Sequence, residues 1–365
     1  MKVRRAFLLA HQWVGLAAAA FLVVIAVSGS ALVFENEIDR ALNPALSYVP
    51  NPDGRLRPLP LEELVARLNA GRPDDPIGGV RIADRSDQAY EFSSRLRRST
   101  FVDPYLGRVL GSRDREKSLA RWLHLLHTRF NAGDIGEQMV GWFSVAMLGL
   151  ATSGLVLWWP RKIAALRSSS SWKRLNFDLH NVLGVYSWLV IVAITLSGVL
   201  IAFEAKTDPL VRRLNAGPEP PAPQSTPMAG AKRITLDQAI AIGESALPGA
   251  VTSNVNVPAN PKAVFRILKK FPEDRTPAGR SRVYLDQFSG AVLLVENTRT
   301  AALGTRILNL KRSAHTGDIF GAPTQALYFL VSVGIAMQAI TGVLIWWNAR
   351  ASSSPPRPSR RSRSL

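Results

Sequence analysis

The sequence predicts a helical membrane protein: a bundle of four membrane-spanning helices built from two internal repeats, each repeat carrying an external α+β domain. The 365 residues are 47 % apolar, yet the mean hydropathy is only +0.06, so very apolar and quite polar segments alternate. A helix needs about 20 apolar residues to cross a hydrocarbon core. Four segments without Lys, Arg, Asp or Glu meet this length: residues 12–34, 139–159, 181–203 and 325–347.

The positions of the charged residues predict how the chain is oriented. Lys and Arg gather before the first segment, between the second and third, and after the fourth, whereas acidic residues flank the opposite ends. Cytoplasmic loops are enriched in Lys and Arg, so we expect both termini to be cytoplasmic. The first segment is longer than the roughly 7 to 15 residues of a signal-peptide core, so we expect it to be retained. The predicted location is the inner (cytoplasmic) membrane of a bacterium, with two periplasmic domains.

Composition excludes several kinds of function. Much of the net charge of +18 is the topological signal and its contact with anionic lipid, so we expect no nucleic-acid partner. The chain contains no cysteine, which excludes iron-sulfur clusters, covalently attached haem, thiolate zinc sites and disulfides. Any metal chemistry must therefore use His, carboxylate or Met side chains, or a cofactor.

The membrane segments repeat in sequence. HQWVGLAAAAFLVVIAVSGSALVFE (11–35) aligns with HNVLGVYSWLVIVAITLSGVLIAFE (180–204) at an offset of 169. LLHTRFNAG and its following apolar stretch align with SAHTGDIFG and the last apolar stretch at an offset of 188. The matched pairs include His11 with His180, Gly15 with Gly184, Gly29 with Gly198, His127 with His315, and Trp158 with Trp346.

The polar regions repeat as well. STFVDPYLGRVLG (99–111) and SRVYLDQFSGAVLLV (281–295) each predict a strand, a tight turn and a strand, with Asp before the turn and Gly at its end. Amphipathic helices are predicted from residues 61 and 236, and the Pro-rich stretch 217–230 is typical of a linker. The predicted organisation is helix 1 in 1–35, external domain 36–120, amphipathic segment and helix 2 in 121–160, cytoplasmic loop 161–178, helix 3 in 179–204, external domain 205–312, helix 4 in 313–347, and basic cytoplasmic tail 348–365.

The chain resembles the PepSY-associated transmembrane family of iron-regulated membrane proteins, and within it the inner-membrane siderophore reductases of the ferrioxamine type. The hairpin VDPYLGRVL, the H-x3-G openings at 11–15 and 180–184, and the WWPR ending at 158–161 carry this resemblance. It covers nearly the whole chain. It implies PepSY-like external domains, a four-helix core that binds b-type haem, and periplasmic reduction of a ferric chelate.

The five histidines all lie near the ends of the membrane segments. His11 and His180 open the first and third segments at one depth, where two imidazoles can serve as axial ligands of one haem iron. His127 and His315 precede the second and fourth segments and are the predicted ligands of a second, outer haem. His124 lies three residues before His127 on the same helix face, so either could be the ligand. The remaining one would bind a propionate or substrate, and we favour His127 as the ligand because it has a repeat partner.

Glycines follow the first histidine of each repeat on one helix face. Gly15 and Gly29 fall on the face of His11, and Gly184 and Gly198 fall on the face of His180. They leave space in which a macrocycle could bind, and Gly29 and Gly198 lie about 27 Å along the helix from the inner histidines at 1.5 Å per residue. Close helix packing by small residues explains the same pattern.

The predicted function is that of a haem b oxidoreductase with two haems, which passes electrons across the bilayer to an external acceptor. By resemblance the acceptor is a ferric siderophore, since Fe(II) is held less firmly by hard oxygen ligands. No nucleotide-binding motif occurs, so the donor must be another protein or a quinol. Catalytic residues are not identified. The alternatives are a haem-free PepSY scaffold or sensor, a b-type cytochrome with another acceptor, and transport, which the uncharged spans disfavour.

Overall fold

The computed structural model describes residues 2–51, 54–159, 165–166, 171–215, 220–228 and 230–352. The basic residues Arg161, Lys162 and Arg167, the tail beyond 352, and residues 217–219 and 229 of the predicted linker lie outside these residues. The chain divides into two compact units. The helical unit comprises residues 1–30, 126–202 and 326–365, and the sheet unit comprises residues 31–125 and 203–325.

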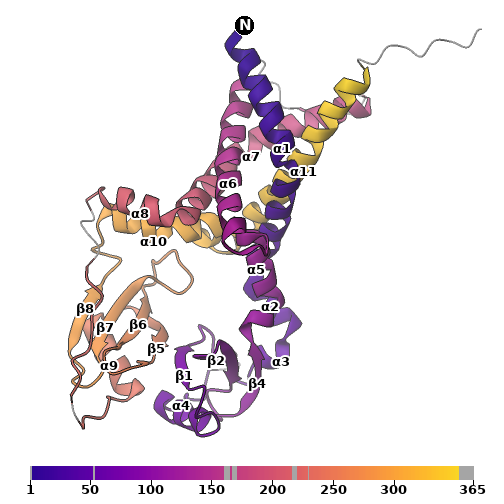
Figure 1. The fold of residues 1–365 in the computed structure, drawn as a ribbon. Helices are drawn as coiled ribbons and strands as arrows, with labels where there is room; N and C mark the ends of the chain where they lie inside the picture. The colour runs from indigo at the N-terminus through magenta and orange to yellow at the C-terminus, as the bar shows by residue number, and fades with distance from the viewer. Residues whose placement is uncertain are drawn as a thin grey trace, which may run out of the picture. The chain divides into compact units, whose positions relative to one another are not determined.

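Four long helices make up most of the helical unit (Figure 1). They are α1 (Lys2–Val33), α6 (Gly133–Trp158), α7 (Trp172–Ala202) and α11 (Ala322–Ser352). Within the described residues, these four helices are long and apolar enough to cross a membrane. Each begins several residues before the segment predicted from hydropathy, because a helix can continue through polar residues beyond the hydrocarbon core.

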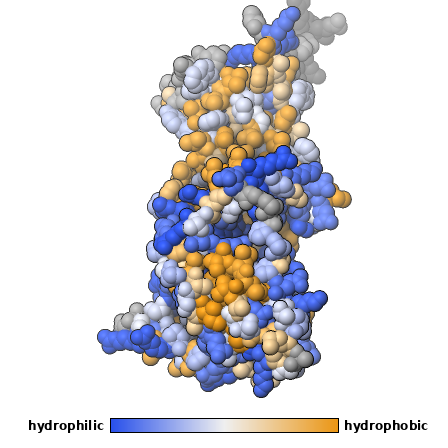
Figure 2. All heavy atoms as spheres, turned by 90° about the vertical axis from the view of Figure 1, so that its left-hand side faces the viewer, coloured by the Kyte–Doolittle hydropathy of each residue, from blue (hydrophilic) through white to orange (hydrophobic). Residues whose placement is uncertain are grey.

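A small apolar core joins the four helices. Its buried members come from each of them: Ala18, Leu22, Ala26, Met147, Ile191, Val331, Ile335 and Ala336. Many apolar side chains are exposed on the helices instead, as Figure 2 shows on the face turned to the viewer. Exposed apolar residues on helices of membrane length imply contact with the lipid bilayer.

The sheet unit contains one antiparallel sheet of eight strands, in the order β4-β3-β2-β1-β5-β6-β7-β8. The strands are β1 (Ile77–Arg81), β2 (Tyr90–Ser94), β3 (Arg98–Val102), β4 (Val109–Asp114), β5 (Val251–Asn256), β6 (Val264–Lys270), β7 (Ser281–Asp286) and β8 (Val292–Glu296). The hairpins β3–β4 and β7–β8 are the two that the turn residues predict.

The two predicted external regions share this sheet rather than forming two separate sheets. Strand β1 pairs with β5, so that Val80 lies opposite Val255. Without this pairing each half would expose an edge strand with unsatisfied backbone groups. The helices α4 (Leu61–Ala70) and α9 (Leu236–Ala246) supply buried side chains to a core that also includes Phe92 and Phe265 of the strands.

Each of these two helices is capped by an acidic residue of the other. The carboxylate of Asp237 accepts hydrogen bonds from the backbone N–H groups of Leu61 and Glu62, at 2.9 and 3.0 Å. In return, Glu62 accepts one from the backbone N–H of Leu236 at 2.8 Å. The first N–H groups of a helix have no partner within the helix, so each carboxylate satisfies donors that the other helix leaves open.

Shorter helices complete the sheet unit. They are α2 (Glu35–Leu42), α3 (Pro44–Ser47), η1 (Arg115–Lys117), the first residues of α5 (Leu119–Arg129), α8 (Glu204–Arg212), α10 (Leu303–Thr316) and η2 (Asp318–Phe320). Helix α2 is tied to the edge strand β4 by Asp39, which accepts two hydrogen bonds from Arg113. Helix α8 is tied to α10 by Asp208 and Lys311, at 2.8 Å.

Candidate functional site

His11 of α1 and His180 of α7 face each other inside the helical unit. Their ring centroids are 6.3 Å apart and their planes cross at 89°. A metal ion held by two imidazole nitrogens at about 2.0–2.1 Å from each places the ring centres about 6 Å apart. The two histidines that the repeat pairs are thus neighbours, and their separation suits a shared ligand; that they hold a haem stays a prediction.

The two rings are held in the same way by the second helix of each half. Nδ1 of His11 is 2.9 Å from Oγ of Ser153 on α6. Nδ1 of His180 is 3.0 Å from Oγ1 of Thr341 on α11, and 3.1 Å from the carbonyl oxygen of Gln338. Ser153 and Thr341 occupy aligned positions at the offset of 188.

Two glycines that follow these hydroxyl residues lie against the rings. A Cβ atom on Gly154 would be 3.4 Å from Cε1 of His11, and one on Gly342 would be 3.4 Å from Cε1 of His180. The sequence analysis did not assign Gly154, Gly342, Ser153 or Thr341 to the site. The aligned Ser/Thr-Gly pairs were the signal that could have found them.

The glycines that the sequence analysis did assign lie elsewhere on the helices. A Cβ atom on Gly15 would be 3.7 Å from Cδ2 of Leu150, and one on Gly184 would be 2.7 Å from Nε2 of Gln338. Side chains of α6 and α11 thus lie beside these two glycines. Their predicted contact with a macrocycle stays a prediction, as does that of Gly198 on α7.

His127 lies at the C-terminal end of α5 and is bonded to α1. Its Nδ1 is 2.9 Å from the carbonyl oxygen of Ile25 and 3.4 Å from Oγ of Ser28. A Cβ atom on Gly29 would be only 2.8 Å from Cε1 of His127, so the glycine is needed for this ring to approach α1. Gly29 therefore accommodates the histidine itself.

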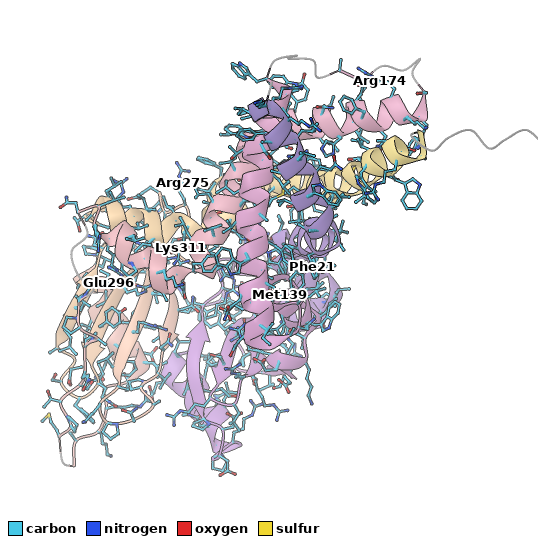
Figure 3. All side chains as sticks on the ribbon, turned by 45° about the horizontal axis from the view of Figure 1, so that its top comes forward. Phe21, Met139, Arg174, Arg275, Glu296 and Lys311 are labelled. Carbon is cyan, nitrogen blue, oxygen red and sulfur yellow. The ribbon has the colours of Figure 1, made fainter. Side chains whose placement is uncertain are left out.

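Aromatic packing fixes the turn that carries His127. Phe130 and Asn131 between α5 and α6 have positive φ angles of 48° and 54°, which are uncommon for residues other than glycine. Phe130 packs on Phe21 of α1 and Phe143 of α6, with ring centroids 5.5 and 6.2 Å apart, and Phe21 is labelled in Figure 3. This packing offsets the strain and keeps the end of α5 against the bundle.

The remaining two histidines belong to the sheet unit, His124 on α5 and His315 on α10. Both are half-buried. The pairing of His127 with His315, and the choice between His124 and His127 as ligand, stay predictions. Among the described residues no three His, Cys, Asp or Glu side chains gather into a metal-binding group.

Four membrane-length apolar helices and an eight-stranded antiparallel sheet define a multi-pass membrane protein with a substantial polar domain. Residues 8–349 match the model of the PepSY-associated TM region, so the chain belongs to that family. The predicted family is thereby confirmed. No curated protein matches the chain.

Proposed function

We propose that this protein is an inner-membrane haem b oxidoreductase that passes electrons across the bilayer to reduce ferric siderophore iron on the periplasmic side. The observation that carries the proposal is the facing pair His11 and His180, 6.3 Å apart between ring centroids. Two imidazoles on separate membrane helices match the axial ligand set of a b-type haem. A bound haem would accept and release single electrons.

The donor set fits haem better than a bare metal ion. Tetrahedral zinc takes three or four protein ligands, whereas His11 and His180 provide two nitrogen atoms. A macrocycle brings the other four ligands itself. What the chain provides is a pair of half-buried imidazoles whose Nδ1 atoms lie beside the hydroxyl groups of Ser153 and Thr341.

A second haem would lie near the outer face, with His127 and His315 as ligands and His124 as the alternative to His127. A duplication would supply one histidine from each repeat to each of the two haems. The sheet unit, on the periplasmic side, would receive the ferric siderophore. The donor would be another protein or a quinol.

Two other functions use the same fold. A haem-free scaffold or sensor accounts for the sheet unit. It gives no role to His11 and His180, whose Nδ1 atoms lie beside hydroxyl groups at aligned positions of α6 and α11. A b-type cytochrome with a different acceptor has the same membrane chemistry and differs only in what the sheet unit receives.

A visible spectrum tests the haem. We expect the purified full chain to show reduced-minus-oxidised bands of b-type haem at two haems per chain. His11→Ala and His180→Ala should each remove one haem, whereas Gln12→Ala, one residue further along α1, should leave both. If the protein purified from haem-replete cells is colourless, the proposal is wrong. A ratio near one haem per chain would rule out the second haem.

Reoxidation kinetics test the acceptor. The reduced protein in lipid nanodiscs should be reoxidised by ferric hydroxamate siderophore, with Fe(II) trapped by a ferrous chelator. A gallium siderophore of the same shape, which cannot be reduced, is the matched control. Reoxidation by other acceptors but not by the ferric chelate would favour the cytochrome.

A further inference from the structure

The hydroxyl groups beside His11 and His180 already donate their hydrogens elsewhere. Oγ of Ser153 donates to the carbonyl of Leu150 at 3.1 Å. Oγ1 of Thr341 donates to the carbonyls of Met337 and Gln338, at 2.8 and 3.1 Å. A hydroxyl has one hydrogen and two lone pairs, so while that hydrogen is given to the helix carbonyl the oxygen accepts from the imidazole.

In that arrangement the imidazole donates from Nδ1. For His180 the carbonyl of Gln338 reinforces this, because a carbonyl has no hydrogen to give. With its hydrogen on Nδ1, each ring has a lone pair on Nε2 and can bind a metal there. A hydrogen bond on the far nitrogen also orients the ring and raises the basicity of the ligating one.

The same arrangement recurs at His127. Ser28, 3.4 Å from Nδ1 of His127, donates its hydrogen to Val24 at 2.6 Å and to Ile25 at 3.1 Å. The aligned hydroxyl of Ser197 donates to Ala193 and Ile194, at 2.5 and 3.0 Å. Ser28 and Ser197, which are aligned between the two halves, thus both bond through their hydroxyl groups to carbonyls of their own helices.

We propose that Ser153 and Thr341 are positioning residues that fix the Nδ1–H tautomer of His11 and His180 and hold the two rings perpendicular across the inner haem iron. This inference rests on the proposed function. If both rings bind the iron, imidazole planes crossed at 89° would interact with different d orbitals, and those orbitals would stay nearly equal in energy. Low-spin ferric haem with crossed ligand planes gives a strongly anisotropic electron paramagnetic resonance spectrum, whereas parallel planes give a rhombic one.

The variants remove the hydroxyl and keep the shape. Ser153→Ala, Thr341→Val and the double variant are compared with Thr152→Ala, which removes a neighbouring hydroxyl on α6 that is bonded only to Leu148 among the described residues. Ser153→Thr restores the hydroxyl. Spectra are recorded on the full chain, together with the reduction potential of the inner haem.

We expect one strongly anisotropic signal in the unaltered chain, absent from His11→Ala. The double variant should shift that signal toward a rhombic one and change the potential, while Thr152→Ala and Ser153→Thr should match the unaltered chain. If Ser153→Ala loses the inner haem, a Ser153→Thr variant that retains this haem supports the positioning role. A Ser153→Thr variant that also lacks the haem overturns the positioning role.

Two further results overturn the assignment in distinguishable ways. A haem-loaded double variant with unchanged spectrum and potential, or a rhombic inner signal in the unaltered chain, overturns the positioning role and leaves the proposed function standing. Absence of haem from the unaltered chain overturns both.

Discussion

Asp286, the last residue of β7, begins the turn to β8 and is buried. Burial alone would raise the pKa of this carboxyl, but hydrogen bonds from the backbone of Ser289, Thr226 and Phe288 outweigh it and lower the pKa to about 2. The aligned Asp103 accepts similar bonds from Tyr105 and Leu106, yet its Oδ2 has no partner among the described residues.

The low pKa predicts an acid-sensitive hairpin. The carboxylate form of Asp286 is the one that folding favours, so its contribution is complete above the unfolded pKa of about 3.9 and is lost as the pH falls from there toward 2. Asp286→Asn should lower the local stability by about 1–3 kcal/mol at neutral pH. Hydrogen exchange of residues 281–296 measures this, and Asp103→Asn should have a smaller effect on residues 98–114.

Gly29 gives a second prediction for a single residue. A methyl group there would be 2.8 Å from Cε1 of His127, so Gly29→Ala should displace the ring and lower the haem content from two to one per chain. Gly149→Ala, on α6, would add a methyl with no atom within 4 Å and should keep both haems. Equal haem content in the two variants would show that His127 is not a ligand.

The reciprocal caps of α4 and α9 act between elements. Asp237→Ala should remove the cap of α4 at a cost of about 1 kcal/mol of stability. Glu62→Ala should cost less, because Thr235 still caps α9 through its capping box with Gln238. Because each residue also lies at the start of the helix that the other caps, we expect the double variant to depart from additivity. Denaturant unfolding followed by hydrogen exchange in β1 and β5 measures this.

The control is Glu63→Ala, whose carboxylate pairs with Arg67 on the surface. A loss of stability in Glu63→Ala as large as that in Glu62→Ala would refute the cap.

The sequence was most informative where a single segment decides its own structure. The spans were predictable because 20 apolar residues suffice to define one, and the two hairpins because Asp and Gly mark their turns. The β1–β5 pair was not predictable, because it joins residues far apart in the chain. In addition, the β1 sequence IGGVR shows no clear alternation of apolar and polar residues. Likewise His11 and His180 were predictable from their repeat, whereas Ser153 and Thr341 became partners only once the rotation of α6 and α11 was known.

At the scale of the whole molecule, the charge pattern predicts which side of the membrane each segment occupies. The chain has no cysteine, so a single introduced thiol reports its own location. Ser245→Cys on α9 should react with an impermeant maleimide once the outer membrane is opened. Ser171→Cys, just before α7, should react only after the inner membrane is lysed. The reverse labelling pattern would invert the predicted topology.

The seam between β1 and β5 also constrains how the protein is made. β1 is synthesised well before β5, and two membrane helices, α6 and α7, intervene. On the proposed topology, the edge of β1 stays unpaired until both helices are inserted and the second half of the sheet has crossed the membrane. An edge that stays open is prone to wrong pairing. If the sheet unit is periplasmic, as proposed, we expect biogenesis of this protein to depend on a periplasmic chaperone that covers the open edge of β1.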